Sequence, residues 1–456
     1  MAKIAQKNIF SWKEIDAASD LNRLRLVLSV LPDEELMLHL ESRRGRGRDD
    51  YPIRPTWNAL IAGIIYQHPS AASLLRELWR NGELRELCGF EPFGGAAAVP
   101  SDDAFGRFLA LLLNEEKLLA DIFDRLLEQL GELLPELGCL LAVDSKAIHS
   151  HGRPVKDEEK KAETDRRRDA DADWGVKTYK GTRADGGKWE KVKAWFGYKL
   201  HLVVDSVYEL PLGFELTVAS AGDTVNLTPL IEDLAGKHPE IAARAEELAA
   251  DKGYDSAENN REIYDDYGIK PVIDKRTMWK DGETTRPLDP ERVDQFVYDE
   301  TGRVFCVCPI TGEMRDMFHF GFEKDRAALK YRCPAAALGV DCQGRAECEA
   351  RAAVGVGEFG RTVRVPLDLE RRIFTPIARH TEKWKKAYAR RTSVERVNSR
   401  IDNVLGFEHH YIRGLGKMRT RVTLALIVML AMALGRIRED QAELMRSLTK
   451  PVIRAA

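Results

Sequence analysis

The chain has 456 residues, of which 44% are hydrophobic, and its net charge is −3. This length suggests roughly two to four structural units with a full-sized core. The small negative charge excludes a globally basic surface, so any contact with nucleic acid must be local. The first residues, MAKIAQKNIFSW, lack the apolar run of a signal peptide. We therefore expect a cytoplasmic protein that does not contact a membrane.

The N-terminal part of the chain is expected to be helical. Residues 1–50 indicate a helical arm, and residues 51–115 a helical domain in which Pro55 suits a helix start and Ser70 and Ser101 can cap further helices. Short helices joined by tight turns are typical of a packing or dimerisation module, and equally of a helix-turn-helix DNA reader. We expect DNA binding here, although the pattern alone does not separate the two.

A mixed α/β region is predicted over residues 136–280, and two aspartates follow apolar strands in it. The continuous apolar run LLAV predicts a strand over 140–143 that ends at Asp144, and ELAA predicts a second strand that ends at Asp251. The carboxyl ends of strands are where open α/β sheets place their sites. Either aspartate alone is explained as well by capping a loop.

Between these aspartates, WFGYKLHLVVD and LPLGFELTVAS predict two strands of a hairpin, and the helix after them could be capped by Asp223 or Thr224. The stretch from Lys156 to Lys193 is highly charged and lacks apolar periodicity. It predicts a long surface loop, which is either solvated or, because tryptophans are interleaved with its charges, in contact with DNA.

A third acid lies in the arginine-rich stretch AYARRTSVERVNSRID, residues 387–402. Tyr388, Arg391 and Glu395 are spaced three and four apart, so they share one helical stripe. Glu395 could simply pair with Arg391, an interaction worth about 0.3 kcal/mol. Arginine and tyrosine side chains are also suited to binding phosphate. A neighbouring apolar stripe is expected to dock on the sheet; it comprises Val394, Val397, Ile401 and Val404 or Leu405.

Together, Asp144, Asp251 and Glu395 predict metal-dependent chemistry. Three adjacent carboxylates repel one another and ionise together only beside a cation. Hard carboxylate oxygens select Mg²⁺ or Mn²⁺. Two such ions about 4 Å apart can activate a water or a 3′-hydroxyl and stabilise the leaving oxygen of a phosphodiester.

These residues resemble the DDE transposases of bacterial insertion sequences, which have an RNase H-like catalytic core. LLAVDSK resembles the first-aspartate strand of that family, ADKGYDS its D-x-G-Y motif, and YARRTSVE its third motif, tyrosine, two residues, arginine, three residues, glutamate. The three acids are 107 and 144 residues apart and stand in the order of the family. The resemblance covers most of the chain, including the stretch that precedes the core.

The resemblance implies an α/β fold in which an RNase H-like mixed sheet follows an N-terminal helical domain and is completed by residues 384–440. It also implies that Asp144, Asp251 and Glu395 bind two Mg²⁺ or Mn²⁺ ions, and that Tyr388 and Arg391 hold DNA phosphates near the cut. The implied reaction is cleavage of double-stranded DNA at transposon ends and strand transfer to target DNA by a homo-oligomer. Two alternatives are a catalytically inactive DNA-binding protein and a structure-specific nuclease on the same core.

One position departs from the family pattern. Members often have a lysine seven residues after the glutamate, where this chain has Asp402. Arg396 and Arg400 carry the nearest alternative charges, but helical geometry places them elsewhere on the surface. The DNA contact expected at this position is therefore not assigned to a residue.

Residues 281–383 are predicted to form an insertion between the second aspartate and the glutamate, and they hold five of the seven cysteines. Four of these cysteines could bind one structural Zn²⁺, with Cys306 as a spare ligand. Because no C-x-x-C pair is present, reduced buried cysteines explain the pattern equally well. The four predicted ligands are Cys308, Cys333, Cys342 and Cys348.

Overall fold

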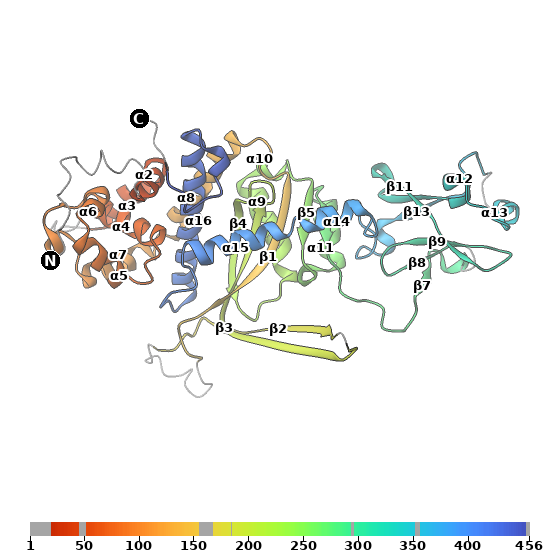
Figure 1. Ribbon diagram of the computed structural model, residues 1–456, viewed down its shortest axis with the longest axis horizontal. Coiled ribbons are helices and arrows are strands. Elements are labelled where there is room, and N and C mark those ends of the chain that lie inside the picture. The colour runs from red at the N-terminus through yellow and green to blue at the C-terminus, as the bar shows by residue number, and fades with distance from the viewer. Residues whose placement is uncertain are drawn as a thin grey trace, which may run out of the picture.

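The computed structural model describes residues 20–44, 52–154, 167–183, 185–292, 296–351 and 356–452. Three parts follow one another along its long axis: N-terminal helices, a central mixed sheet with its helices, and a smaller part rich in strands (Figure 1). The first 19 residues of the predicted N-terminal arm lie outside these ranges.

The N-terminal part is helical, as predicted. The hydroxyl oxygens of Ser70 and Ser101 accept hydrogen bonds from the backbone N–H groups of Ser73 and Ala104, at 3.2 and 3.3 Å, so both predicted caps are confirmed. The helices are α2 (Leu21–Val30), α3 (Glu34–Arg44), α4 (Ile53–Ile65), α5 (Ala71–Arg80), α6 (Gly82–Cys88), α7 (Asp102–Leu112) and α8 (Glu116–Leu133).

A long C-terminal helix, α16 (Leu415–Arg438), joins the N-terminal helices to the sheet. It packs against α2, α4 and α8 on one side and against strand β4 (Pro211–Val218) on the other. The apolar run predicted as a buried core helix is confirmed, since Val422 to Gly435 are buried almost throughout. Its length and composition would also suit a membrane span, but 83% of its most apolar window is buried inside the protein.

The central sheet is mixed, as predicted. Strand β1 (Leu140–His149) lies between β3 (Lys188–Asp205), which is antiparallel to it, and β5 (Glu247–Ala250), which is parallel. Strand β6 (Lys270–Ile273) continues the parallel side, and β4 pairs with β3 in the predicted hairpin. The core order is therefore β4-β3-β1-β5-β6.

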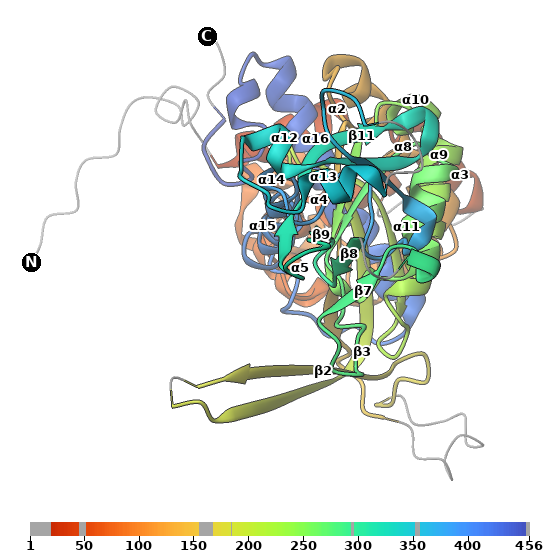
Figure 2. The ribbon, with the colours of Figure 1, turned by 90° about the vertical axis from the view of Figure 1, so that its right-hand side faces the viewer.

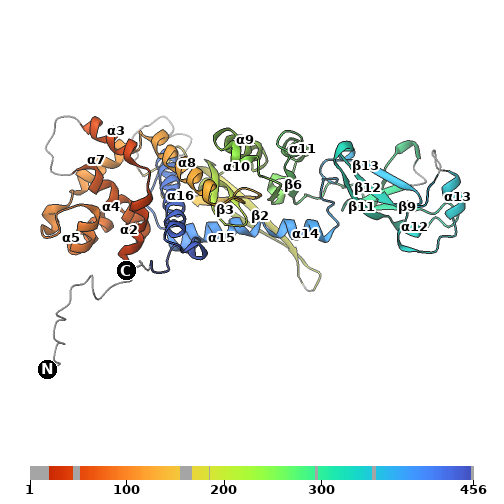
Figure 3. The same cartoon turned by 90° about the horizontal axis from the view of Figure 1, so that it is seen from above.

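Helices cover both faces of this sheet. Figure 3 shows the sheet between α9 (Leu227–Lys237) and α11 (Ala257–Asp265) on one side and α14 (Glu382–Ala389) and α15 (Thr392–Ser399) on the other. The predicted apolar stripe is confirmed, because Val394, Val397, Ile401 and Leu405 are at most 4% exposed. A short helix α10 (Pro239–Ala242) and a π-helical turn (Arg400–Val404) complete this part.

Two local predictions were wrong. Strand β1 does not end at Asp144 but continues to His149 because its second half still pairs with β3. The predicted caps of α9 are absent: the Asp223 carboxylate pairs with Lys199 instead, and the Thr224 hydroxyl donates to the carbonyl of Gly253. Tertiary partners outcompete the local capping bonds at both residues.

The predicted surface loop is also wrong from residue 173 onward. Strand β2 (Asp173–Thr182) pairs with the first half of β3, and this hairpin extends well beyond the core (Figure 2). Two glycines make the pairing possible, because a Cβ at Gly175 or Gly181 would lie 2.3 or 2.6 Å from the Trp195 or Trp189 ring opposite. Residues 155–166 of the same predicted loop lie outside the described residues.

The predicted insertion between β6 and α14 has its own core, in which Trp279, Tyr331 and Phe374 are buried. Its strands form two small sheets, in the orders β10-β9-β8-β7 and β11-β12-β13. The elements are β7 (Thr285–Pro287), β8 (Phe296–Asp299), β9 (Val304–Val307), β10 (Met314–Asp316), β11 (Phe318–Glu323), β12 (Ala328–Arg332), α12 (Pro334–Leu338), α13 (Arg345–Ala350) and β13 (Thr362–Pro366).

Candidate active site

The register of the parallel strands brings the two predicted aspartates together. Val143 of β1 lies opposite Ala250 of β5, so the next residues, Asp144 and Asp251, leave the paired region side by side. The two carboxylates are close enough for Asp251 to raise the pKa of Asp144. The sheet backbone therefore juxtaposes two acids that are 107 residues apart in the chain.

Arg391 connects the third acid to this pair. One guanidinium nitrogen, Nη1, donates to Oδ2 of Asp144 at 2.8 Å, and Nη2 donates to Oε1 of Glu395 at 2.7 Å. The i,i+4 pair expected from the sequence thus exists, but the same guanidinium also spans 247 residues of chain to the sheet. Glu395 remains 53% exposed, whereas the Asp144 side chain is only 14% exposed.

The charge on Asp144 is unfavourable without a cation. Burial, and then the neighbouring Asp251 charge, raise the pKa of Asp144 to about 6, while the charges of Arg391 and Lys177 act in the opposite direction. A buried carboxylate beside a second carboxylate attracts positive charge, and Arg391 supplies part of it. This donor set has the hard oxygen chemistry that Mg²⁺ and Mn²⁺ prefer.

The sequence did not predict a further acid at this edge of the sheet. Asp223 follows β4, and its Oδ2 and the Oδ1 of Asp251 would each lie 2.7 Å from a Cβ added at Gly253. The glycine of the D-x-G-Y motif is therefore needed for the two carboxylates to approach the same backbone. Strand β4 runs parallel to β1 and β5, so its carboxyl end lies at the same edge of the sheet. An acid shortly after this strand was therefore the sequence feature that could have predicted Asp223 as part of the site.

Buried polar side chains contact one another and Asp223 next to these acids. Tyr254 is fully buried, and its hydroxyl lies 3.1 Å from Nδ1 of His201, which is buried as well. Lys199 Nζ donates to Asp223 at 3.0 Å. Burial and the charges of Asp223, Asp144 and Asp251 raise the pKa of Tyr254 well above its ordinary value, so this tyrosine is a neutral support.

Tyr388, which belongs to α14, lies near the acids of the site. Its ring stacks on Trp384 with centroids 5.0 Å apart, and the Arg391 guanidinium lies 6.0 Å from the ring centroid. Burial raises the pKa of the Tyr388 hydroxyl, and the charges of Asp274 and Asp251 raise it further. The single helix expected here is interrupted, since Tyr388 belongs to α14, Arg391 lies between the helices and Glu395 belongs to α15, but Arg391 contacts both of the other residues.

Asp402, the position that departs from the family pattern, has a specific partner. The ammonium of Lys146, on β1, donates to the Asp402 carboxylate at 2.6 Å. A lysine is therefore present next to this position, although it comes from another part of the chain. Arg396 and Arg400 both pair with Glu209, at 2.6 and 3.1 Å. The prediction that these arginines lie elsewhere is confirmed, and the local positive charge comes from Lys146.

The five cysteines of the insertion line one small cavity. They come from β9, from the turn after it, and from the region of α12 and α13. They are Cys306, Cys308, Cys333, Cys342 and Cys348, and all are free thiols. Within the described part of the chain, however, no three histidine, cysteine, aspartate or glutamate side chains have an arrangement that could hold a metal ion, in this cavity or at the acidic site.

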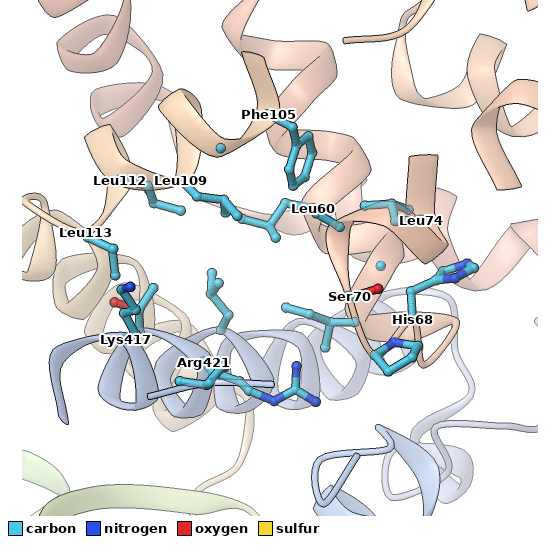
Figure 4. A pocket seen from close by; sticks show the side chains of 18 of the residues that line it. Leu60, His68, Ser70, Leu74, Phe105, Leu109, Leu112, Leu113, Lys417 and Arg421 are labelled. Carbon is cyan, nitrogen blue, oxygen red and sulfur yellow. The ribbon is translucent and has the colours of Figure 1, made fainter. Parts of the chain in front are cut away.

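An apolar cavity of about 420 Å³ lies elsewhere, between the N-terminal helices and α16 (Figure 4). Leu60, Phe105 and Leu109 face it from the helices, and Arg421 from α16. None of the described residues that line this cavity is an aspartate or a glutamate, whereas the sheet edge has several.

Comparison with known proteins gives one family. The model of the transposase DDE domain matches residues 135–431, which is about two thirds of the chain and includes all three predicted acids. No curated protein sequence matches the chain.

Proposed function

The chain belongs to the transposase DDE domain family of phosphoryl-transfer enzymes, and we propose that Asp144, Asp251 and Glu395 are its catalytic residues. The proposed reaction is Mg²⁺- or Mn²⁺-dependent cleavage of DNA strands at transposon ends, followed by strand transfer to target DNA. One observation carries the proposal: Asp144 and Asp251 lie side by side at one sheet edge, and Arg391 links Asp144 to Glu395. We further propose that the core sheet, ordered β4-β3-β1-β5-β6, is RNase H-like.

The three carboxylates are the groups that would hold two divalent ions, as the family generally uses divalent metals. Bound there, such ions would activate a water or 3′-hydroxyl and neutralise charge on the phosphate. Asp144 is held rigidly within the sheet, whereas the more exposed Glu395 side chain can change its partner. Arg391 and Tyr388 would bind the non-bridging oxygens of the scissile phosphate or its neighbour, because a guanidinium and a phenol are both phosphate donors.

The experiment that tests this function uses the full chain and duplex DNA carrying the genomic ends that flank its gene. With Mg²⁺ we expect nicking at the ends and joining of the freed 3′-hydroxyls to a target plasmid, and neither product with EDTA. Binding without cleavage would support the alternative of an inactive DNA-binding protein. Cleavage without end specificity or joining would support a structure-specific nuclease. A shift to larger complexes in sedimentation on adding the ends would support the proposed homo-oligomer.

We also propose that Cys308, Cys333, Cys342 and Cys348 bind one structural Zn²⁺ that stabilises the insertion. Their convergence on one cavity supports this proposal, because they come from separate elements. Hydrogen bonds from Thr311 and from nearby backbone N–H groups lower the pKa of the Cys308 thiol to about 7. The thiolate is the form that binds zinc.

Metal analysis of the purified, reduced protein tests the zinc site. We expect about one Zn²⁺ per chain, which is lost together with thermal stability in Cys308→Ser/Cys342→Ser. Cys139→Ser is the control, because Cys139 is a free cysteine that does not line the cavity. A wild-type protein that neither retains zinc nor takes it up from solution would rule the site out.

A further inference from the structure

The hairpin formed by β2 and the first half of β3 is not covered by helices, unlike the rest of the core sheet (Figures 2 and 3). It projects from the body of the molecule, on the same side as α14 and α15 (Figures 2 and 3). Among the described side chains of the hairpin, that of Trp195, at its base, is buried, and its indole N–H donates to the carbonyl of Tyr198 at 3.1 Å. A two-stranded hairpin that no other layer covers is only marginally stable in water, unless its side chains bind another molecule.

Cross-strand pairing gives the hairpin two different faces, since paired residues point to the same side. Lys177 pairs with Lys193, and Tyr179 with Lys191, so three lysines and a tyrosine share one face. Trp189 lies on this face as well, across Gly181 near the tip. We call this the basic–aromatic face; it comprises Lys177, Tyr179, Trp189, Lys191 and Lys193.

The basic–aromatic face is exposed and its charge is uncompensated. Residues 173–194 contain six basic and three acidic residues, although the whole chain has a net charge of −3. Tyr179 and Trp189 are 39% and 38% exposed. The Lys193 ammonium lies 5.8 Å from the Tyr179 ring centroid, and none of the three lysines forms an ion pair with a carboxylate of the described residues.

The hairpin projects on the side of the sheet where the candidate active site lies. Helices α14 and α15, which carry Tyr388 and Glu395, are on that same side (Figure 3). Strand β3 continues from the hairpin into the core, where its residue Leu202 pairs with Asp144. A ligand bound along the hairpin would therefore run toward the acids of the site.

We propose that the basic–aromatic face binds the DNA that leads into the active site, with its lysines on backbone phosphates and the Trp189 and Tyr179 rings against bases or sugars. The proposal rests on the proposed function, because it places the DNA by the acids that would cut it. Lysines spaced along a ribbon suit the phosphates of a duplex, whose major groove admits a two-stranded β-ribbon. Exposed rings add stacking that tolerates any base sequence.

Exposed apolar side chains on the opposite face suggest a different partner, a second copy of the chain. Trp174, Val176 and Val192 are 52%, 62% and 58% exposed on it. These apolar side chains could contact a second copy of the chain, whereas they offer no charge to complement DNA. The two partners are separated by substituting one face at a time.

The test measures binding of the full chain to an end duplex and to a duplex of unrelated sequence, in EDTA and over a range of salt concentrations. In Lys177→Gln/Lys191→Gln/Lys193→Gln, the slope of log Kd against log salt should fall by about three, one for each lost phosphate contact. Trp189→Leu should weaken binding about ten-fold with little change in slope. Lys188→Gln is the matched control, because Lys188 lies on the same strand but pairs with Thr182 on the opposite face.

The outcomes separate this proposal from the proposed function. A triple variant that keeps the wild-type Kd and slope overturns the role of the hairpin, whether or not the wild type cleaves. Loss of self-association in Trp174→Ala/Val176→Ala together with unchanged DNA binding in the triple variant assigns the hairpin to a second copy instead. A wild type that shows the lysine-dependent slope but never cleaves contradicts the proposed function and leaves the hairpin proposal standing.

Discussion

Glu395→Gln should reduce strand cleavage by on the order of 10³-fold, because it removes an anionic ligand worth several kcal/mol of charge stabilisation in the transition state. DNA affinity should be retained or slightly increased, since one negative charge near the phosphate is lost. Folding should be unaffected, because Glu395 is 53% exposed and its ion pair with Arg391 lies at the surface. Initial rates with Mg²⁺ and Kd values in EDTA measure the two effects separately.

Glu382→Gln is the matched control for this variant. Glu382 lies on α14, is 76% exposed and pairs with Lys385, so it loses the same charge without touching the acids. Its cleavage rate should stay within about two-fold of the wild type, as for surface changes away from a site. Unchanged cleavage in Glu395→Gln would remove this glutamate from the reaction.

Arg391→Ala should reduce cleavage by about 100-fold, the usual effect of removing one preorganised donor to a reacting anion. The variant loses both the phosphate donor and the link between Asp144 and Glu395. Arg391→Lys should recover only part of the rate, because an ammonium cannot span two carboxylates as a planar guanidinium does. Arg390→Ala is the control, since Arg390 pairs with Glu247 instead.

A second readout distinguishes the role of Arg391 from a merely structural one. Its positive charge favours the ionised form of Asp144, so its removal should raise further a pKa that burial and Asp251 already raise to about 6. Carboxyl NMR titration of metal-free protein measures this directly. An unchanged pKa together with an unchanged cleavage rate would show that Arg391 contributes to neither the field nor the reaction.

The sequence predicted the parts of the site that depend on local pattern. Apolar runs located the strands before Asp144 and Asp251, and helical spacing placed Tyr388, Arg391 and Glu395 on one stripe. The register that sets the two aspartates side by side follows from burying both strands in a parallel sheet. The strands and the helical spacing are therefore local features of the sequence.

Long-range partners could not be predicted in this way. The pairing of Lys146 with Asp402 and of Asp223 with Lys199 depends on tertiary geometry, and helix caps or surface charges explained the same residues locally. The β2–β3 hairpin was missed because charged residues dominate its exposed strands, and its few apolar residues, such as Trp174, Val176 and Val192, share a face only once the strands are paired. Its signal was the pairing of glycines with tryptophans across the strands, which becomes visible only when the register is known.

The position of Mn²⁺ tests the central claim most directly. Crystals of the chain bound to an uncleavable DNA end, soaked in Mn²⁺, would locate the ions by anomalous scattering. We predict ions contacted by Asp144, Asp251 and Glu395 at the end of β5, with Arg391 moved from Glu395 toward a phosphate. Manganese bound elsewhere, or Glu395 still paired with Arg391 away from any ion, would contradict the assignment of these three acids to one catalytic site.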